Sequence, residues 1–140
     1  MKLAEVIFEI GKENPQDLAE ALEGKVDSKE VAEMRLKAAK FYLEKSRGEL
    51  DVPALASEDM YKAILEGIKA LRAYFEVQGD LRETISHLED ILGNWVREGW
   101  ELGLKLHYDG YLFENIDSAY ATEYLYRVED FLRNCEIAIS

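Results

Sequence analysis

The sequence predicts an all-α fold, a compact antiparallel bundle of about five helices joined by short loops. Apolar residues recur three and four positions apart along most of the chain, which is the spacing of helices with a buried face. Cap and breaker residues divide this pattern into separate helices, and no segment sustains the alternation of a strand. With 140 residues, 48% of them hydrophobic, the chain suits a single globular domain with its own core.

The first 24 residues are predicted to form a helical extension of this domain. Apolar residues at helical spacing run from Leu3 to Ile10, and Asn14 with Pro15 then supplies an N-cap and a first-turn proline. Gly24 ends this second short helix. We therefore divide the single domain, residues 1–140, into an N-terminal helical extension at 1–24 and a core at 26–138.

A long helix is predicted from Ser28 to Gly48. Asp27 supplies a cap acceptor and Glu30 follows three residues later, as in a capping box. A helix that is apolar on two sides is covered on both, so we expect this helix near the centre of the bundle. Its two apolar stripes are Val31, Met34, Ala38, Phe41 and Tyr42, and Leu36, Ala39, Leu43 and Leu50.

Two more helices follow between proline and glycine breakers. Residues 51–53 (Asp-Val-Pro) interrupt the chain, and the next helix, with the most regular periodicity in the sequence, is expected to end at Gly79. Asp80 and Glu83 repeat the capping signal for a helix that ends at Gly93. Its apolar stripe is Leu81, Ile85, Leu88 and Leu92.

The last two helices are predicted at 95–113 and after the turn at 115–117. Glycine inside a helix costs about 1 kcal/mol relative to alanine, so Gly99 and Gly103 indicate a neighbouring helix or ring packed close to the backbone. One face of the first of these helices carries Trp95, Gly99, Leu102, Leu106 and Phe113, and the core stripe of the last is Ala121, Tyr124, Val128, Phe131 and Cys135.

The net charge of −12 at pH 7 argues against nucleic-acid binding, because such binding draws much of its affinity from Lys and Arg on phosphates. The charge is uneven, with five cations and two acids at 33–47 against eight acids and three cations at 101–140. Complementary ends of this kind would steer self-association or a small anion, and solvated helix faces are the simpler interpretation.

Cellular context is indicated by what the sequence lacks. No apolar run approaches the roughly 20 residues of a membrane span, and acids interrupt the beginning of the chain, unlike a signal peptide. The single Cys135 has no partner for an internal disulfide. Scattered glycines, two histidines and one cysteine provide neither a phosphate loop nor a zinc site. We expect a soluble cytoplasmic protein without cofactor or metal.

Three stretches, residues 26–36, 56–63 and 67–71, resemble the archaeal PaREP (paralogous repeat) proteins in the order and spacing of their helix residues. Trp100 and the segment 106–111 (Leu-His-Tyr-Asp-Gly-Tyr) are similar to the tryptophan and the histidine–glycine segment of that family. The resemblance implies an archaeal origin and a bundle related to HEPN domains and to the C-terminal helical domains of nucleotidyltransferases. The many Glu and few Gln and Asn residues fit a thermophilic source.

Arg82 and His87 are weak catalytic candidates. HEPN-type domains often dimerise, and some are metal-independent ribonucleases with an arginine followed a few residues later by a histidine. In such a site the imidazole moves the 2′-hydroxyl proton and the guanidinium stabilises the phosphorane charge. Against this, residues five apart on a regular helix point about 140° apart, and Glu83 sets an anion beside the phosphate. A capping-region arginine and a boundary histidine are the simpler interpretation.

His107 offers a second placement for the HEPN histidine, and no arginine lies at the matching distance upstream. A domain without that arginine is expected to be a binder. Trp100, His107 and Tyr111 share a helix face, and Glu114 lies two turns beyond His107. These four residues are candidates for binding a small polar or aromatic ligand, with a structural histidine satisfied by one hydrogen bond as the alternative.

The sequence leaves three functions open. We favour a non-enzymatic interaction or dimerisation module, either a homodimer or a domain docked on a protein partner such as a separately encoded nucleotidyltransferase. The second is a domain that binds a small polar or aromatic ligand. The third is a metal-independent endoribonuclease, which requires Arg82 and His87 to meet in one cleft.

Overall fold

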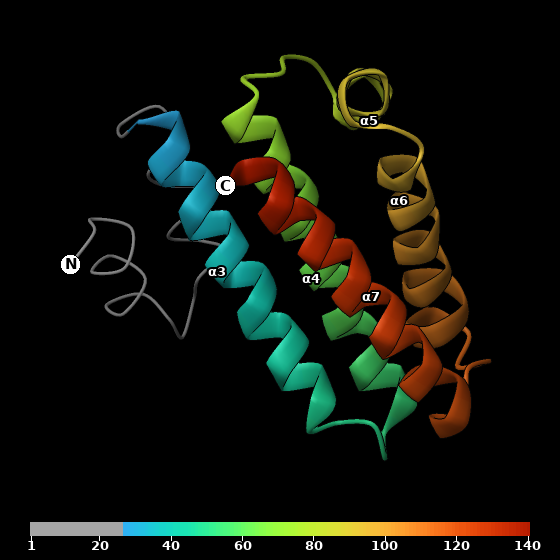
Figure 1. The fold of residues 1–140 in the computed structure, drawn as a ribbon. Coiled ribbons are helices and arrows are strands. Elements are labelled where there is room, and N and C mark those ends of the chain that lie inside the picture. The colour runs from blue at the N-terminus through green and yellow to red at the C-terminus, as the bar shows by residue number, and fades with distance from the viewer. Residues whose placement is uncertain (1–26) are drawn as a thin grey trace.

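A computed structural model of the protein describes residues 27–140, and over that range it is an all-α bundle without strands (Figure 1). This confirms the predicted fold class. The predicted extension at 1–24 lies outside the described residues. The helices are α3 (Ser28–Arg47), α4 (Pro53–Tyr74), α5 (Leu81–Leu92), α6 (Trp95–Lys105), the π-helix η1 (Leu106–Leu112) and α7 (Ser118–Ile139).

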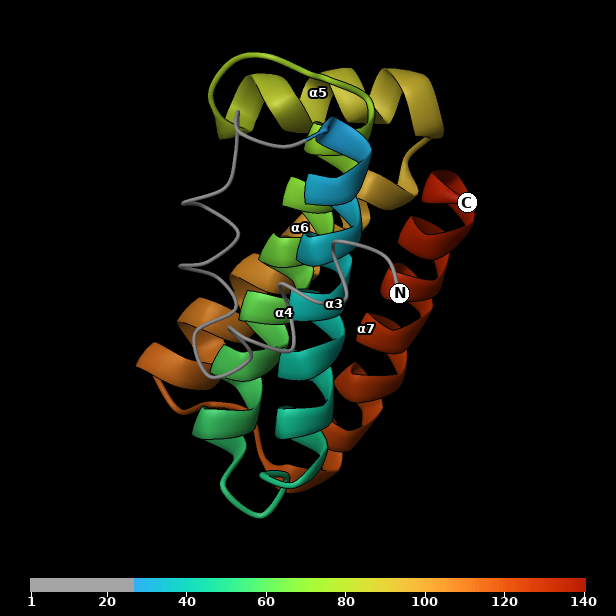
Figure 2. The same ribbon diagram turned by 90° about the vertical axis from the view of Figure 1, so that its left-hand side faces the viewer.

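The helices α3, α4, α6 and α7 alternate in direction along the chain. Figure 1 shows α3 and α6 running one way and α4 and α7 the other, while Figure 2 shows α5 lying across one end of them. Helix α4 holds the centre, because it packs against α3, α5, α6, η1 and α7. Our expectation of a central α3 is wrong for the described part of the chain, where α3 packs mainly on α4 and α7. The buried alanines and glycine of α4 allow neighbours to approach it from several sides.

Side-chain caps fix where three of these helices begin. Asp27 accepts a hydrogen bond from the Lys29 amide at 2.8 Å, and Asp80 forms the predicted capping box with Glu83. At the start of α7, the Asp117 carboxylate accepts a hydrogen bond from the Tyr120 amide at 2.9 Å. Helix α4 ends at Tyr74, before the expected Gly79, because the backbone turns left-handed at Glu76 with φ of 54°.

Two glycines bring α6 close to its neighbours, as predicted. A Cβ atom added to Gly99 would lie 2.2 Å from the Phe131 ring on α7, so only glycine fits there. At Gly103 the added atom would lie 3.2 Å from Ile64 on α4, which is a milder crowding. Around these contacts lies one continuous core, whose fully buried members include Met60, Ile64, Ile68, Leu71, Leu88, Val96, Leu106 and Val128.

A buried ion pair joins α3 to α4. The Arg35 guanidinium donates to both Glu66 carboxylate oxygens, at 3.3 and 3.1 Å, and each side chain is only 1% exposed. Removing one member of such a pair leaves a charge in the core, which costs several kcal/mol, whereas the intact pair adds little net stability. The pair therefore constrains how α3 can lie on α4 more than it strengthens the fold.

The helix predicted at 95–113 changes its winding at Leu106 and continues as η1, a π-helix. A π-helix takes more residues per turn, so the side chains beyond Leu106 rotate away from the face predicted for a regular helix. Phe113, predicted on the same helix face as Leu102 and Leu106, is consequently 66% exposed. Gly110 instead faces α4, where an added Cβ would lie 2.4 Å from Ser57. Among the helices of residues 27–140, none is long and apolar enough to cross a membrane.

Candidate functional site

His107 lies on η1, facing α4, and its ring is held by a carboxylate. The Nδ1 atom of His107 lies 2.7 Å from Oε1 of Glu58, and both side chains are partly buried. Glu58 comes from the first half of α4, so the contact joins residues 49 positions apart in the chain. His107 and Gly110 both lie on the π-helix η1, and Gly110 lies close to Ser57 of α4. This close contact holds η1 against the part of α4 that carries Glu58.

Aromatic rings surround the His107 imidazole. Tyr61 of α4 lies at 4.6 Å between ring centroids with a tilt of 31°, and Tyr111 stacks at 6.0 Å. Tyr108 meets the imidazole edge-on at 5.0 Å, and Trp100 lies 6.0 Å from Tyr61. These separations are those of direct ring contact. Tyr61 and Tyr111 therefore pack against the imidazole itself.

The carboxylate sets the hydrogen-bonding roles of His107. With Glu58 accepting at Nδ1, the neutral ring carries its proton there and keeps Nε2 as an acceptor. Burial, with the charge of Glu58 and the nearby Tyr108 as smaller causes, raises the pKa of Tyr61. Tyr61 thus stays a neutral hydroxyl at physiological pH. The arrangement resembles a positioned base, and the described residues place no nucleophile against it.

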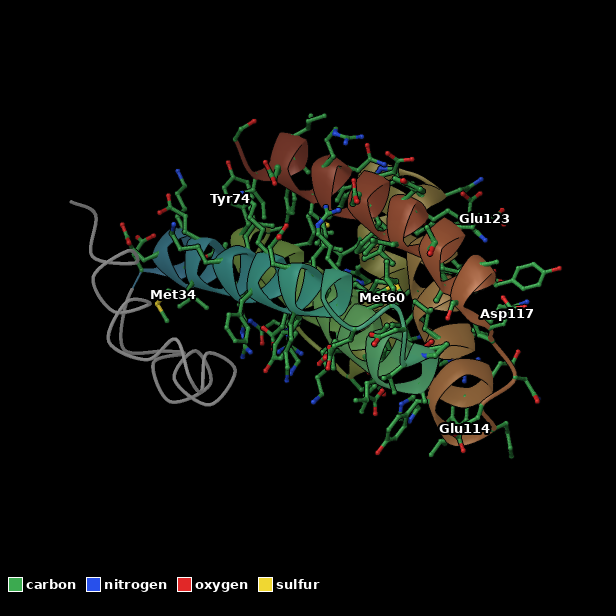
Figure 3. All side chains as sticks on the ribbon, turned by 90° about the horizontal axis from the view of Figure 1, so that it is seen from below. Met34, Met60, Tyr74, Glu114, Asp117 and Glu123 are labelled. Carbon is green, nitrogen blue, oxygen red and sulfur yellow. The ribbon has the colours of Figure 1, made fainter. Side chains whose placement is uncertain are left out.

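Three of the four predicted ligand-binding residues gather at this cluster, and the fourth does not. Trp100, His107 and Tyr111 take part in its ring contacts, whereas Glu114 is exposed in the connector after η1. Figure 3 shows Glu114 at the edge of the bundle. The carboxylate comes instead from Glu58, which is not among the four residues predicted from the sequence. Glu58 and Tyr61 are three residues apart, which indicates that they share a face of α4. Their contact with His107 depends on how α4 packs on η1.

Arg82 and His87 both lie exposed on α5. The helix is regular from Leu81 to Leu92, so the two side chains point about 140° apart. Neither makes a hydrogen bond or an ion pair with another described residue. Within one copy of the chain, the arginine and the histidine are therefore not brought to one phosphate-sized site.

A second feature of this region is a set of exposed apolar side chains on η1, on the residue that follows it and on the first turn of α4, which we name the aromatic end. Leu55 lies one turn before Glu58 on α4, and Tyr108 is joined to Phe113 by a backbone hydrogen bond across a π-turn. Its members are Leu55, Tyr108, Tyr111, Leu112 and Phe113, all between 40% and 66% exposed. Patches of several large side chains mark interaction surfaces more often than scattered ones do.

The described residues contain no group of three or more His, Cys, Asp or Glu side chains that could hold a metal ion. Cys135 is buried in the core, and burial raises the pKa of its thiol, so it stays protonated and unreactive.

Comparison with protein-family models, with curated proteins and with solved structures finds no match to this chain. The relation to the PaREP and HEPN proteins therefore stays a prediction from the sequence, and the function is argued from the geometry above.

Proposed function

We propose that this chain is a non-enzymatic interaction module, a HEPN-like helical bundle that self-associates through the aromatic end. The observation that carries the proposal is the concentration of exposed apolar side chains there, with Phe113 at 66% and Tyr108 at 50% exposure. A π-helix that turns an aromatic residue out of the core into water is a costly arrangement unless that residue has a partner.

The size of the aromatic end suits a small homodimer. Each of its five side chains presents on the order of 100 Å², so two copies would bury on the order of 1,000 Å² of apolar surface. That value is near the lower bound for a specific interface. A two-fold contact opposes each surface with itself, and rings stabilise one another in offset or edge-on pairs.

Charge favours this surface for contact between two copies. A net charge of −12 on each copy resists association, so the contact must fall where carboxylates are sparse. Residues 110–113 (Gly-Tyr-Leu-Phe) carry no charge, and one acid flanks them on each side, Asp109 and Glu114. Association through this surface should strengthen as salt rises, since salt screens the repulsion between copies. Binding to a basic partner would weaken instead.

The test is the oligomeric state by sedimentation over a range of protein and salt concentrations. We expect a dimer for the parent chain and a monomer for the double variant Tyr108→Ser with Phe113→Ser. Tyr126→Ser and Ile137→Ser are matched controls, because these α7 residues are 61% and 66% exposed but lie outside the aromatic end. A parent chain that stays monomeric up to about 0.5 mM contradicts self-association. It would leave this surface to another protein, such as a nucleotidyltransferase.

The competing enzymatic function is a metal-independent ribonuclease using Arg82 and His87. Its requirement is that a second copy bring the two side chains of α5 together, since one copy separates them by about 140°. RNA cleavage in EDTA, lost in both Arg82→Ala and His87→Ala, would replace our proposal by this one. We expect no cleavage above that of a mock preparation.

The other competing function is ligand binding at the cluster of rings around His107, where little space is left for a ligand. The ring contacts around the imidazole are made by Tyr61 and Tyr111 themselves, so a ligand would have to displace a ring. We interpret His107, Glu58 and Tyr61 as the support that fixes η1 and presents the aromatic end.

A further inference from the structure

A hollow in the surface lies between α6 and α7, with a lining distinct from the aromatic end and the His107 cluster. It has two adjoining parts, with volumes of about 200 Å³ and about 300 Å³. Glu98, Leu102 and Arg127 line both parts. We call this hollow the α6–α7 pocket.

The floor of the α6–α7 pocket is apolar and firmly built. The Trp95 ring meets Phe131 edge-on at 5.7 Å, and its Nε1 donates to the Leu92 carbonyl at 3.0 Å. Phe131 in turn lies directly against the backbone of Gly99. These contacts fix both rings, so the floor keeps its shape whether or not the pocket is filled.

Two cations stand at one end of the pocket. Lys105 of α6 and Arg127 of α7 both lie over the Tyr124 ring, with Nζ at 5.9 Å and Cζ at 5.5 Å from its centroid. Each cation is attracted to this ring by a cation–π interaction, and both line the same part of the pocket. Neither forms an ion pair with a described carboxylate, although this part of the chain is strongly acidic.

Three carboxylates line the same hollow, and one of them, Asp130 of α7, pairs with Arg133 at 2.7 Å. Glu98 and Glu101 stand on α6, within the lining that includes Lys105 and Arg127. No ion pair within 4 Å joins these acids to those cations in the described part of the chain. Opposite charges therefore line one pocket, and each charged group is able to form hydrogen bonds with a ligand.

We propose that the α6–α7 pocket binds a free α-amino acid with an apolar side chain. Arg127 and Lys105 receive the α-carboxylate, Glu98 and Glu101 receive the α-ammonium group, and the side chain lies on the floor formed by Leu102 and Phe131. A simple anion would meet the two glutamates, and a simple cation would meet Lys105 and Arg127. A zwitterion satisfies both pairs, and the size of the pocket suits a ligand smaller than a drug-sized molecule.

The test is a titration of the ¹⁵N-labelled chain with L-leucine, followed by amide chemical shifts. We expect saturable shifts confined to α6 and α7. Isopentylamine, which lacks the carboxylate, and 4-methylpentanoate, which lacks the ammonium group, should bind at least about tenfold more weakly, because each leaves one charged pair of the pocket without its partner. Equal binding of either analogue overturns the zwitterion assignment.

Variants locate the site. Arg127→Gln and Glu98→Gln should each weaken L-leucine binding at least about tenfold. Arg97→Gln is the matched control, since Arg97 stands beside Glu98 in sequence but pairs with Glu89 of α5 at 3.0 Å, outside the pocket. An equal loss in the control, or no saturable shift with L-leucine at about 10 mM, overturns the proposal. Self-association through the aromatic end is measured separately, so either proposal can fail alone.

Discussion

The pair formed by α3 and α4 and the arm formed by α6 and η1 attach to the core in different ways. The α3–α4 pair is joined by side chains, with a buried ion pair between Arg35 and Glu66 among them. The arm comes close to its neighbours where side chains are missing, at Gly99, Gly103 and Gly110, and the His107–Glu58 contact adds a link between side chains. The first seam depends on matching charges in the core, and the second depends on leaving room for a neighbour.

The two regions are therefore expected to tolerate different amino-acid substitutions. A charge in the core cannot lose its partner cheaply, but a pair of apolar residues can replace both members. A glycine seam cannot accept even a methyl group unless the opposing side chain moves. The arm, which carries all of the aromatic end but Leu55, is therefore positioned by close packing as well as by the His107–Glu58 contact, and its exposed residues remain open to substitution.

The largest effect is expected at the ion pair. Glu66→Ala should lower the free energy of unfolding by about 3–5 kcal/mol, because the Arg35 guanidinium loses its two hydrogen bonds to the Glu66 carboxylate inside the core. The double variant Arg35→Met with Glu66→Leu should recover most of this loss. Urea unfolding followed by circular dichroism measures both. A loss below about 1 kcal/mol in the single variant would show that the pair does not govern this seam.

The glycine seam should show a graded response. Gly99→Ala should lower the free energy of unfolding by about 3 kcal/mol, because the new methyl group would overlap the Phe131 ring. Gly103→Ala should cost about 1 kcal/mol or less, since Ile64 needs to move only slightly. The same urea experiment compares them. Equal costs at the two positions would contradict a seam set by distance to the neighbour.

A pH effect is expected at the turn between α3 and α4. A hydrogen bond to Asp59, with burial and the charge of Asp59 as smaller causes, raises the pKa of Glu49 from 4.5 to about 7. A raised pKa in the folded state gives stability that is full below pH 4.5 and is lost as pH rises through about 7.

Glu49→Gln removes this titration while keeping a hydrogen-bond donor. The variant should match the parent chain near pH 4 and exceed it in unfolding midpoint at pH 8, by denaturant titration at each pH. Glu123→Gln, an exposed acid on α7, is the control and should not change the pH profile. An unchanged profile in Glu49→Gln would exclude Glu49 as the source of the pH effect.

The smallest effect is expected at the end of the arm. Glu114 has a positive φ of 53°, a conformation that costs a residue with a Cβ about 1 kcal/mol and costs glycine little. Glu114→Gly should therefore raise the thermal midpoint by a few degrees. It should leave the oligomeric state unchanged, because Glu114 lies outside the aromatic end. A lower midpoint would indicate that the Glu114 side chain stabilises the connector.

The sequence by itself determined the helices and much of their contact geometry. Caps such as Asp27, Asp80 and Asp117 and a breaker such as Pro53 act within a few residues of their own position, so their effect can be read locally. Gly99 and Gly103 likewise indicated close packing. Glycine inside a helix is unfavourable, and a close contact with a neighbouring helix explains its presence there.

Only the tertiary structure decided the rest. The partner of His107 is Glu58, 49 residues away, and the partner of Arg35 is Glu66 on the next helix. The π-helical winding of η1 is accompanied by a close approach of Gly110 to Ser57, a contact between different helices. The α6–α7 pocket arises in the same way. Periodicity tells which side of a helix is buried, whereas the identity of the facing residue depends on packing between segments that are distant in the chain.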